Sequence, residues 1–359
     1  MKLTVFQDFA NLNCSTDVNN SSVADENDAA SIFFELANAD LIGYRVARSN
    51  SPSISRDSAM IVIKQHNDSR AHTGGIIWET SYLLAAFLSS KFGSNDNKSD
   101  VNHHPLGKTL EIGAGCGMLG LVLATTMLSS KVVTTEAEEV MGILTENVDQ
   151  NTTNDEEKCI GDEKNGNMDV KGIHGTKHLP VCSKENISVH RLRWDCLQED
   201  ISSSTYSSKG QENDLNPHSF DTIVGTDVVF SPSLVCPLLE TIKLMSHKKD
   251  AESKKSTRIY LCLQVRCADS HSMLFSEAHK YDLEVINITE ELNSHCPWGK
   301  ELECLLLQVN VKEDTTITKH RKKQKKKAKE KKSSKTSSKV NRRKKKDKKS
   351  SKKRKRDEC

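Results

Sequence analysis

Short apolar runs alternate along most of the chain with longer segments in which apolar residues recur at helical spacing. The short runs predict seven strands, at residues 109–112, 131–136, 187–192, 220–230, 258–264, 283–288 and 303–309, the fourth of which runs out to a loop. The longer segments predict helices at residues 81–87, 118–127, 138–151, 235–245 and 270–279. This alternation predicts an α/β fold with a doubly wound, Rossmann-like, seven-stranded sheet. The last two strands follow each other without a helical segment between them, which predicts a C-terminal antiparallel hairpin.

Polar segments interrupt this pattern and set the expected boundaries of the domain. Residues 1–30 are rich in Asn, Ser and Asp and predict a disordered N-terminus. Residues 152–185 and 200–218 have almost no apolar periodicity and predict two flexible insertions. Residues 313–359 form a tail that is rich in Lys and Arg. We therefore expect one domain, at residues 31–312.

The net charge of +3 conceals an uneven distribution of charge. Residues 319–359 hold 24 Lys and Arg against 4 Asp and Glu, whereas the preceding residues hold 28 against 45. So basic a tail is expected to be disordered through self-repulsion, and its clusters are typical of nuclear localisation signals and of nonspecific contacts with phosphates. We therefore expect a nuclear or nucleolar protein, with the cytoplasm as a further location. An import receptor and loosely bound RNA are the partners expected for the tail.

Two further patterns exclude classes of protein. No apolar run approaches the roughly eighteen residues that a membrane span needs, and the N-terminus lacks the charged-then-apolar pattern of a secretory signal. We therefore expect a soluble intracellular protein without a membrane partner. The 11 cysteines include no C-x-x-C pair, which favours reduced thiols over a disulfide framework or a zinc site. No metal is expected.

The first predicted strand leads into a loop with a glycine at every second position. Gly113, Gly115 and Gly117 allow a sharp turn and let the backbone approach a ligand, while the following helix offers unpaired N–H groups at its N-terminus. Gly115, Gly117 and Gly120 also satisfy the G-x-G-x-x-G pattern of dinucleotide-binding proteins, which keeps a nicotinamide-dependent oxidoreductase open. Glu136 ends the next strand, where a carboxylate can accept both ribose hydroxyls of a nucleoside cofactor.

Glu111 helps to distinguish between the possible cofactors. This acid lies two residues before the first glycine and gives the pattern E-x-G-x-G-x-G. A carboxylate there would crowd a pyrophosphate but suits a ligand with a cationic amino-acid end, such as S-adenosylmethionine. With this motif the sequence resembles the class I, seven-strand methyltransferases. The resemblance implies that Gly113, Ala114 and Gly115 form a backbone bed for S-adenosylmethionine.

Within that class the chain resembles protein methyltransferases of the methyltransferase-like 21 or family-16 type, which modify lysine. In that group a Gly-Gly turn followed by a tryptophan lines the cofactor site, and Trp78 takes this place after Gly74 and Gly75. A tryptophan after the third strand contacts the adenine, and Trp194 matches it, although Asp195 follows where glycine is common. The acceptor motif of the group is D-x-x-Y or D-x-x-F.

The acceptor motif is matched by Asp227-Val228-Val229-Phe230. The resemblance implies that Asp227 orients the acceptor amine, with Phe230 beside it, and that Thr226 contacts the adenosine through its backbone. Phe230 lacks the hydroxyl of tyrosine, so arginine and histidine acceptors stay open beside lysine. The Asn-Pro-Pro motif of nucleic-acid amine methyltransferases is absent here, but the basic tail keeps an RNA methyltransferase as an alternative.

The implied activity is N-methylation of a protein with S-adenosylmethionine as the cofactor. A lysine is the favoured acceptor, in a substrate protein that the sequence does not identify. An inactive binding module that retains the same fold is the remaining alternative.

Overall fold

The fold is described from a computed structural model, which describes residues 3–7, 29–47, 58–66, 73–93, 104–154, 180–205, 214–247 and 256–312. Residues 313–359 form a separate unit of the chain and lie outside the described residues. The prediction of a disordered tail therefore falls outside them, as do those for residues 8–28 and for the central parts of both insertions, 155–179 and 206–213.

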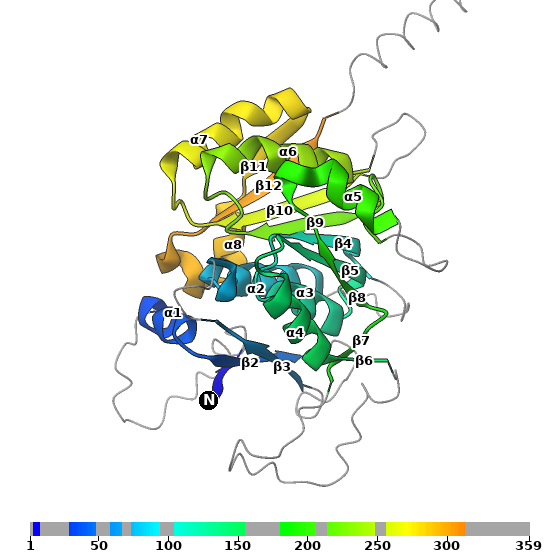
Figure 1. Ribbon diagram of the computed structural model, residues 1–359. Coiled ribbons are helices and arrows are strands. Elements are labelled where there is room, and N and C mark those ends of the chain that lie inside the picture. Colours follow the sequence, from blue (N-terminus) through cyan, green and yellow to red (C-terminus); the bar gives the residue numbers. More distant parts are fainter. Residues whose placement is uncertain are drawn as a thin grey trace, which may run out of the picture. The chain divides into compact units, whose positions relative to one another are not determined.

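Seven strands form the central sheet, in the order β11-β12-β10-β9-β4-β5-β8 (Figure 1). Neighbouring strands from β10 to β8 run parallel, and β12 is antiparallel to both of its neighbours. The predicted α/β fold, with a doubly wound sheet that ends in an antiparallel pair, is confirmed. The strands are β4 (Gly107–Ile112), β5 (Ser129–Glu136), β8 (Ile187–Arg191), β9 (Thr222–Thr226), β10 (Arg258–Leu263), β11 (Leu283–Asn287) and β12 (Leu305–Val311).

Helices cover both faces of this sheet, because each face carries apolar side chains that are buried by packing (Figure 1). One face is covered by α2 (Glu79–Gly93), α3 (Met118–Thr125), α4 (Met141–Asn151) and α8 (Thr289–His295). The other is covered by α5 (Leu197–Thr205), α6 (Pro232–Met245) and α7 (Ala268–Glu277). The described chain also forms short 3-10 helices at Thr73–Gly75, Trp194–Cys196, Ala278–Tyr281 and Pro297–Leu302.

A small second sheet packs on the outer side of the layer that contains α3 and α4 (Figure 1). It consists of β1 (Leu3–Gln7), β2 (Leu41–Ala47) and β3 (Ser58–Lys64), and α1 (Ala29–Ala37) precedes β2. The edge of β3 is paired with side chains of α4: Asn151 bonds both backbone groups of Val62, and Asn147 both of Lys64, at 2.7–3.0 Å. These amides replace a neighbouring strand, so the edge of β3 is satisfied.

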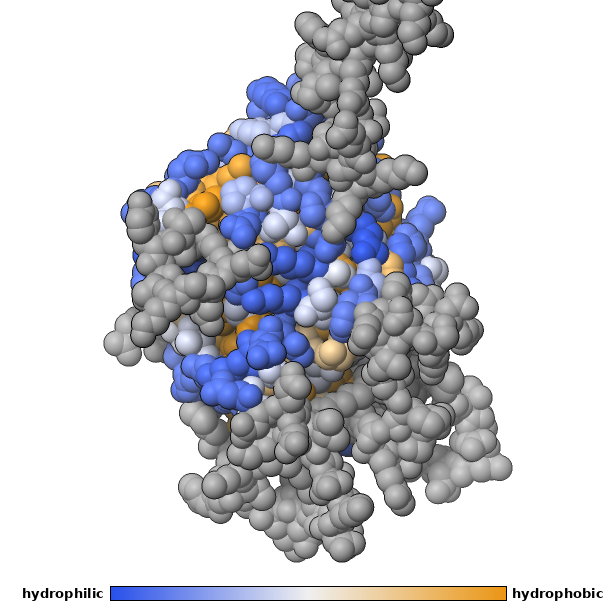
Figure 2. All heavy atoms as spheres, turned by 90° about the vertical axis from the view of Figure 1, so that its right-hand side faces the viewer, coloured by the Kyte–Doolittle hydropathy of each residue, from blue (hydrophilic) through white to orange (hydrophobic). Residues whose placement is uncertain are grey.

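On the face drawn in Figure 2, the coloured surface is mainly hydrophilic, with small apolar patches. No helix in the described ranges is both long enough and apolar enough to cross a membrane.

Four details differ from the sequence prediction. β1 lies within residues 1–30, where disorder is expected; it is held by pairing with β2 rather than by its own composition. The two ends of the first insertion pair as β6 (Thr152–Thr153) and β7 (Cys182–Ser183). The start of the second insertion belongs to α5, where Asp200 is buried and accepts hydrogen bonds from two arginines. The local polar composition does not reveal these contacts, because each depends on a partner in another segment of the fold.

The fourth difference concerns the segment between β11 and β12. The two strands pair antiparallel as predicted, but α8 and the 3-10 helix Pro297–Leu302 lie between them, so the connection is no tight hairpin. Leu292 and Leu302 of this connection are buried in the core cluster that includes α2. With only seven residues and mostly polar side chains, α8 shows too little apolar periodicity to be predicted.

Candidate active site

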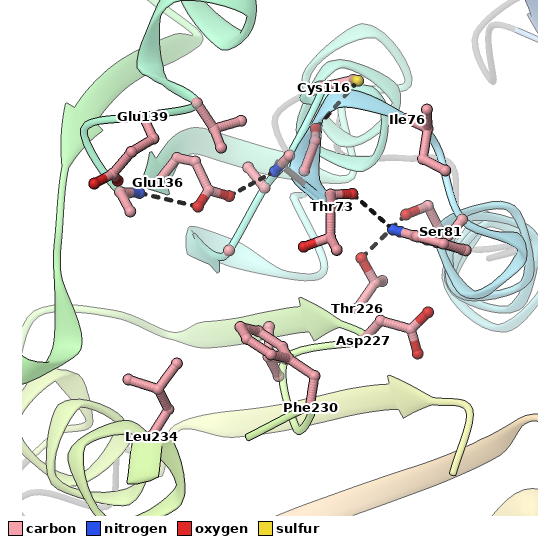
Figure 3. Close-up of a pocket in the computed structure, with 18 of the residues that line it drawn as sticks. Thr73, Ile76, Ser81, Cys116, Glu136, Glu139, Thr226, Asp227, Phe230 and Leu234 are labelled. Carbon is pink, nitrogen blue, oxygen red and sulfur yellow. Dashed lines mark hydrogen bonds between the residues drawn. The ribbon is translucent and has the colours of Figure 1, made fainter. Parts of the chain in front are cut away.

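A cavity of about 510 Å³ opens at the carboxyl ends of the parallel strands (Figure 3). β4 lies in the middle of this region, between β5 on one side and β9 on the other. The connections from these strands depart to opposite faces of the sheet, and such a switch point leaves a crevice for a ligand. Residues from the loops after β4, β5, β8, β9 and β10 line the cavity, together with the segment that leads into α2. Its volume suits a cofactor-sized ligand.

The loop after β4 approaches its neighbours so closely that its glycines are required. Gly113 has a φ of +63°, and a Cβ there would lie 2.9 Å from Cγ1 of Val228. Gly115 has a φ of +55°, and a Cβ there would lie 3.1 Å from the carbonyl oxygen of Gly74. Any larger residue would strain the turn and narrow the cavity. Gly113, Ala114 and Gly115 all line the cavity, as predicted for a backbone bed.

Glu136 lies at the end of β5 and lines the cavity (Figure 3). The N–H of Gly115 donates to its Oε2 at 2.8 Å, and the N–H of Ala137 donates to its Oε1 at 2.9 Å. Burial raises the pKa of Glu136 above its ordinary value, while these two backbone donors act in the opposite direction. Each oxygen retains a further acceptor position, so the carboxylate can still receive ligand hydroxyls.

Both predicted tryptophans line the cavity. Trp194 lies against the glycine loop, since a Cβ on Gly113 would be 3.4 Å from its Cζ2. Trp78 is held by its indole N–H, which donates to the carbonyl oxygen of Thr73 at 2.9 Å. Thr226 is also at the cavity, and its hydroxyl is 3.0 Å from that of Ser81 at the start of α2 (Figure 3). The two indoles therefore form large apolar walls.

Asp227 follows β9 and adopts the left-handed region, with a φ of +52°. Such a conformation is costly for a residue with a Cβ and is often found at functional sites. The carboxylate is only 7% exposed, and its Oδ1 accepts the N–H of Gln264 at 2.8 Å. Its Oδ2 accepts Nη2 of Arg266 at 2.9 Å. Phe230 lines the same cavity and is 46% exposed, so its ring is open to a partner (Figure 3).

Arg266 follows β10 and contacts three other residues around the site. Its guanidinium lies over the ring of Trp78, 4.1 Å from the centroid, and forms ion pairs with Asp227 and with Glu79, the latter at 3.5 Å. Arg266 is therefore engaged in local ion pairs with two carboxylates at the edge of the site. Ser81 and Glu79, at the start of α2, are among the residues of the site that sequence reasoning misses, and a helix start next to Trp78 is the signal that could have found them.

Glu111 is the one predicted site residue that the structure places outside the cavity. Its side chain lies between β4 and α3, where a Cβ on Gly120 would be 2.5 Å from its Oε2. That oxygen is buried and has no hydrogen-bond partner among the described residues. Burial raises the pKa of Glu111 to about 8. Glu111 is therefore absent from the residues that line the cavity, and its contact with a ligand stays a prediction.

The glycines also bear on the choice of cofactor. Of Gly115, Gly117 and Gly120, only Gly115 lines the cavity, whereas Gly120 lies inside α3 against Glu111. Gly117, whose backbone would approach the pyrophosphate in the dinucleotide pattern, does not line the cavity. Within the described ranges, no group of three or more His, Cys, Asp and Glu side chains is placed to hold a metal ion.

The family model described as lysine methyltransferase matches residues 55–163, which include the glycine loop and Glu136. Over these residues the chain is similar to the lysine methyltransferase family. Its relatives include the mouse (Mus musculus) protein-lysine methyltransferase METTL21E, which is 25% identical over 61% of this chain and 68% of the relative. The zebrafish (Danio rerio) protein N-lysine methyltransferase METTL21A is 21% identical over 63% of this chain and 77% of the relative.

A third relative also carries the name of a lysine methyltransferase. Ribosomal lysine N-methyltransferase 5 of Lachancea thermotolerans is 26% identical over 59% of this chain and 59% of the relative. These similarities support S-adenosylmethionine as the cofactor of the protein and favour a methyltransferase over a nicotinamide-dependent oxidoreductase.

Proposed function

We propose that this protein transfers the methyl group of S-adenosylmethionine to the side-chain nitrogen of a lysine in a protein substrate. The observation that carries this proposal is the placement of two carboxylates on opposite sides of one cavity, Glu136 on the β5 side and Asp227 on the β9 side of the glycine loop (Figure 3). One carboxylate is suited to ribose hydroxyls and the other to an amine.

The residues at the cavity fit S-adenosylmethionine. The loop from Gly113 to Gly115 lets the backbone approach the ligand, and only glycine is accommodated at its two ends. Glu136 retains acceptor positions for the ribose, and the indole of Trp194 offers a face on which a planar base stacks. Trp78 and Thr226 complete the wall toward the acceptor side. Bound there, the cofactor supplies an electrophilic methyl group on a positively charged sulfur.

The acceptor side of the cavity positions the amine. Asp227 is fixed by the N–H of Gln264 and by Arg266, so its carboxylate presents its remaining lone pairs in one direction. A lysine nitrogen that donates to Asp227 is thereby aligned for in-line displacement, and alignment of this kind accounts for a large part of catalytic rate enhancement. The exposed ring of Phe230 can pack on the aliphatic part of the lysine side chain and exclude water.

The test incubates the full-length protein with methyl-labelled S-adenosylmethionine and a methylation-depleted cell extract. Half of the product is digested with protease and half with ribonuclease, and the labelled protein is hydrolysed to identify the modified amino acid. We expect label that is lost only to protease and recovered as methyl-lysine. Label in arginine or histidine would change the acceptor, and label lost only to ribonuclease would favour the RNA methyltransferase. Binding of S-adenosylmethionine without any transfer would favour the inactive module.

We further propose that the basic tail, residues 319–359, directs the protein to the nucleus or nucleolus through an import receptor and contacts RNA without sequence preference. The proposal is supported by its 24 Lys and Arg against 4 Asp and Glu. A fluorescent fusion that lacks these residues should lose its nuclear concentration, and RNA binding by the full chain should weaken steeply with salt. An unchanged location of the shortened fusion would contradict the targeting role.

A further inference from the structure

Arg266 holds its guanidinium at the mouth of the cavity by three contacts. The group lies 4.1 Å from the centroid of the Trp78 ring, 2.9 Å from Oδ2 of Asp227 and 3.5 Å from Oε2 of Glu79. Glu79 is in turn held by the side-chain amide of Gln264 at 3.2 Å. A stacked and doubly paired guanidinium is a fixed positive charge, because arginine does not lose its proton in proteins.

The charges of this cluster do not cancel. Asp227 and Glu79 carry two negative charges and Arg266 one positive charge, so one net negative charge remains for a cationic side chain. Asp227 is also not saturated, since an ionised carboxylate offers about four acceptor positions and three N–H groups, one of Gln264 and two of Arg266, occupy it here. An acceptor lysine can therefore bind at Asp227 while Arg266 stays in place.

Three neighbouring titratable groups, two thiols and a phenol, do not add to this charge. Cys262 in β10 and Cys304 before β12 face Asp227, and burial raises the pKa of Cys304 to about 12 and that of Cys262 well above its ordinary value. Burial likewise raises the pKa of Tyr82, which faces Glu79 from within α2. All three therefore stay neutral at physiological pH.

Methyl transfer requires the neutral form of the lysine amine, and carboxylates alone disfavour that form. Lysine binds as an ammonium ion, but only the neutral amine has the lone pair that attacks carbon. Two adjacent carboxylates would stabilise the ammonium and hold back its proton, whereas a nearby positive charge acts in the opposite direction. Arg266 is the positive charge that the structure places there, 34% exposed at a mouth through which a released proton can reach water.

We propose that Arg266 is a positioning residue that promotes loss of the proton from the acceptor lysine bound at Asp227. This inference rests on the proposed function. The ammonium first gives one proton to water; the nitrogen lone pair then forms the new N–C bond as the S–C bond breaks, and the electron pair of that bond stays on sulfur. Arg266 contributes by destabilising the charged form of the amine and by keeping Asp227 in a fixed orientation, and it forms no bond to the transferred methyl.

The experiment measures kcat against pH at saturating concentrations of S-adenosylmethionine and of the acceptor protein recovered from the extract experiment. Arg266→Met removes the charge and retains much of the side-chain volume, and Arg266→Lys restores the charge. The matched control is Arg191→Met: Arg191 is 37% exposed, pairs with Glu138 at 2.8 Å and Asp200 at 3.0 Å, and does not line the cavity.

For Arg266→Met we expect the midpoint of the kcat profile to move up by about one pH unit, with roughly a tenfold loss of kcat at neutral pH. The KM for the acceptor should fall severalfold, because two uncompensated carboxylates attract the ammonium more strongly. Arg266→Lys should restore the midpoint, and Arg191→Met should leave it unchanged. S-adenosylmethionine affinity, measured by calorimetry, should change less than about threefold in every variant.

A loss of activity in Arg266→Met with an unchanged midpoint would overturn the inference and leave Arg266 a merely structural residue. An unchanged kcat would overturn it as well. Both results differ from failure of the proposed function, in which the wild-type protein itself transfers no methyl group to lysine.

Discussion

The cavity has two carboxylates in equivalent topological positions that are held in different ways. Glu136 ends β5 and Asp227 follows β9, the two parallel neighbours of β4. Glu136 is bound only by backbone N–H groups within this site, those of Gly115 and Ala137. Asp227 is bound by one backbone N–H and by the side chain of Arg266. Glu136 is therefore fixed by the backbone, whereas Asp227 is part of a network of side chains.

This difference matches two different tasks. A cofactor is the same in every turnover, so a carboxylate fixed by backbone suits its ribose. A protein substrate brings a charge that must change during the reaction, and a carboxylate balanced by a second charge can respond to that change. We therefore expect substitutions on the Glu136 side to alter cofactor affinity, and those on the Asp227 side to alter the rate of transfer.

The largest effect is expected for Asp227→Asn. Asparagine retains the shape and tolerates the left-handed backbone, but it lacks the charge that orients the amine. Methyl transfer should fall by about 10²-fold or more, while the affinity for S-adenosylmethionine changes little. Asp282→Asn is the control, because Asp282 has a similar φ of +55° but lies after α7, away from the cavity. A transfer rate equal to that of the wild type would remove Asp227 from the mechanism.

Glu136→Gln should have the next largest effect, and on the opposite quantity. A charge-assisted contact to the ribose would be lost, so affinity for S-adenosylmethionine should fall by roughly 10- to 100-fold. At saturating cofactor, kcat should stay within a few-fold of the wild type. Calorimetry and initial rates measure the two quantities separately. If kcat fell and affinity did not, the division of tasks between the two carboxylates would be wrong.

A smaller effect is expected for Phe230→Ala. The ring is 46% exposed, so its removal costs little stability, but it takes away an apolar surface beside Asp227. Transfer should fall by about threefold to tenfold, equivalent to the partial burial of one side chain, mainly through the KM for the acceptor. Phe275→Ala, 40% exposed in α7, controls for the loss of a surface ring. Equal rates for both variants would mean that the acceptor does not pack on Phe230.

The smallest effect on transfer is expected for Glu111→Gln, whose carboxyl lies outside the cavity. Its pKa is raised from 4.5 to about 8 in the folded protein, so the folded state binds more protons than the unfolded state in that range. The free energy of unfolding should therefore fall as pH rises from 4.5 to 8, by about 1 kcal/mol per pH unit. The Gln variant should lack this component in urea titrations at several pH values. If the free energies of unfolding of the wild type and the variant depended on pH in the same way, the raised pKa of Glu111 would be contradicted.

Most of the fold can be predicted from the sequence because strands and helices alternate with clear apolar patterns. The glycine loop, both tryptophans and the D-x-x-F motif could likewise be located, because each stands next to the end of a predicted strand or the start of a helix. All of these line the cavity, while their individual roles stay predictions.

The remaining features depend on contacts that no local pattern encodes. Glu111 has the spacing of a ligand contact, but β4 is covered on both faces, and this side chain points to the helix face where Gly120 leaves room for it. Arg266 meets Asp227 across 39 residues of sequence, and its stacking on Trp78 brings in a third element. The connection from β11 to β12 becomes helical because Leu292 and Leu302 pack into a core that is formed by segments distant in sequence.

The strand order has a consequence for how the chain is completed during synthesis. β12 is made last among the described strands, yet it lies between β10 and β11, and β11 has no other neighbour in the sheet. Until residues 305–311 have emerged, β10 presents an unpaired apolar edge and β11 has no strand to join. A stop codon anywhere between β11 and β12 therefore removes two strands from the sheet, because β11 loses the strand with which it pairs.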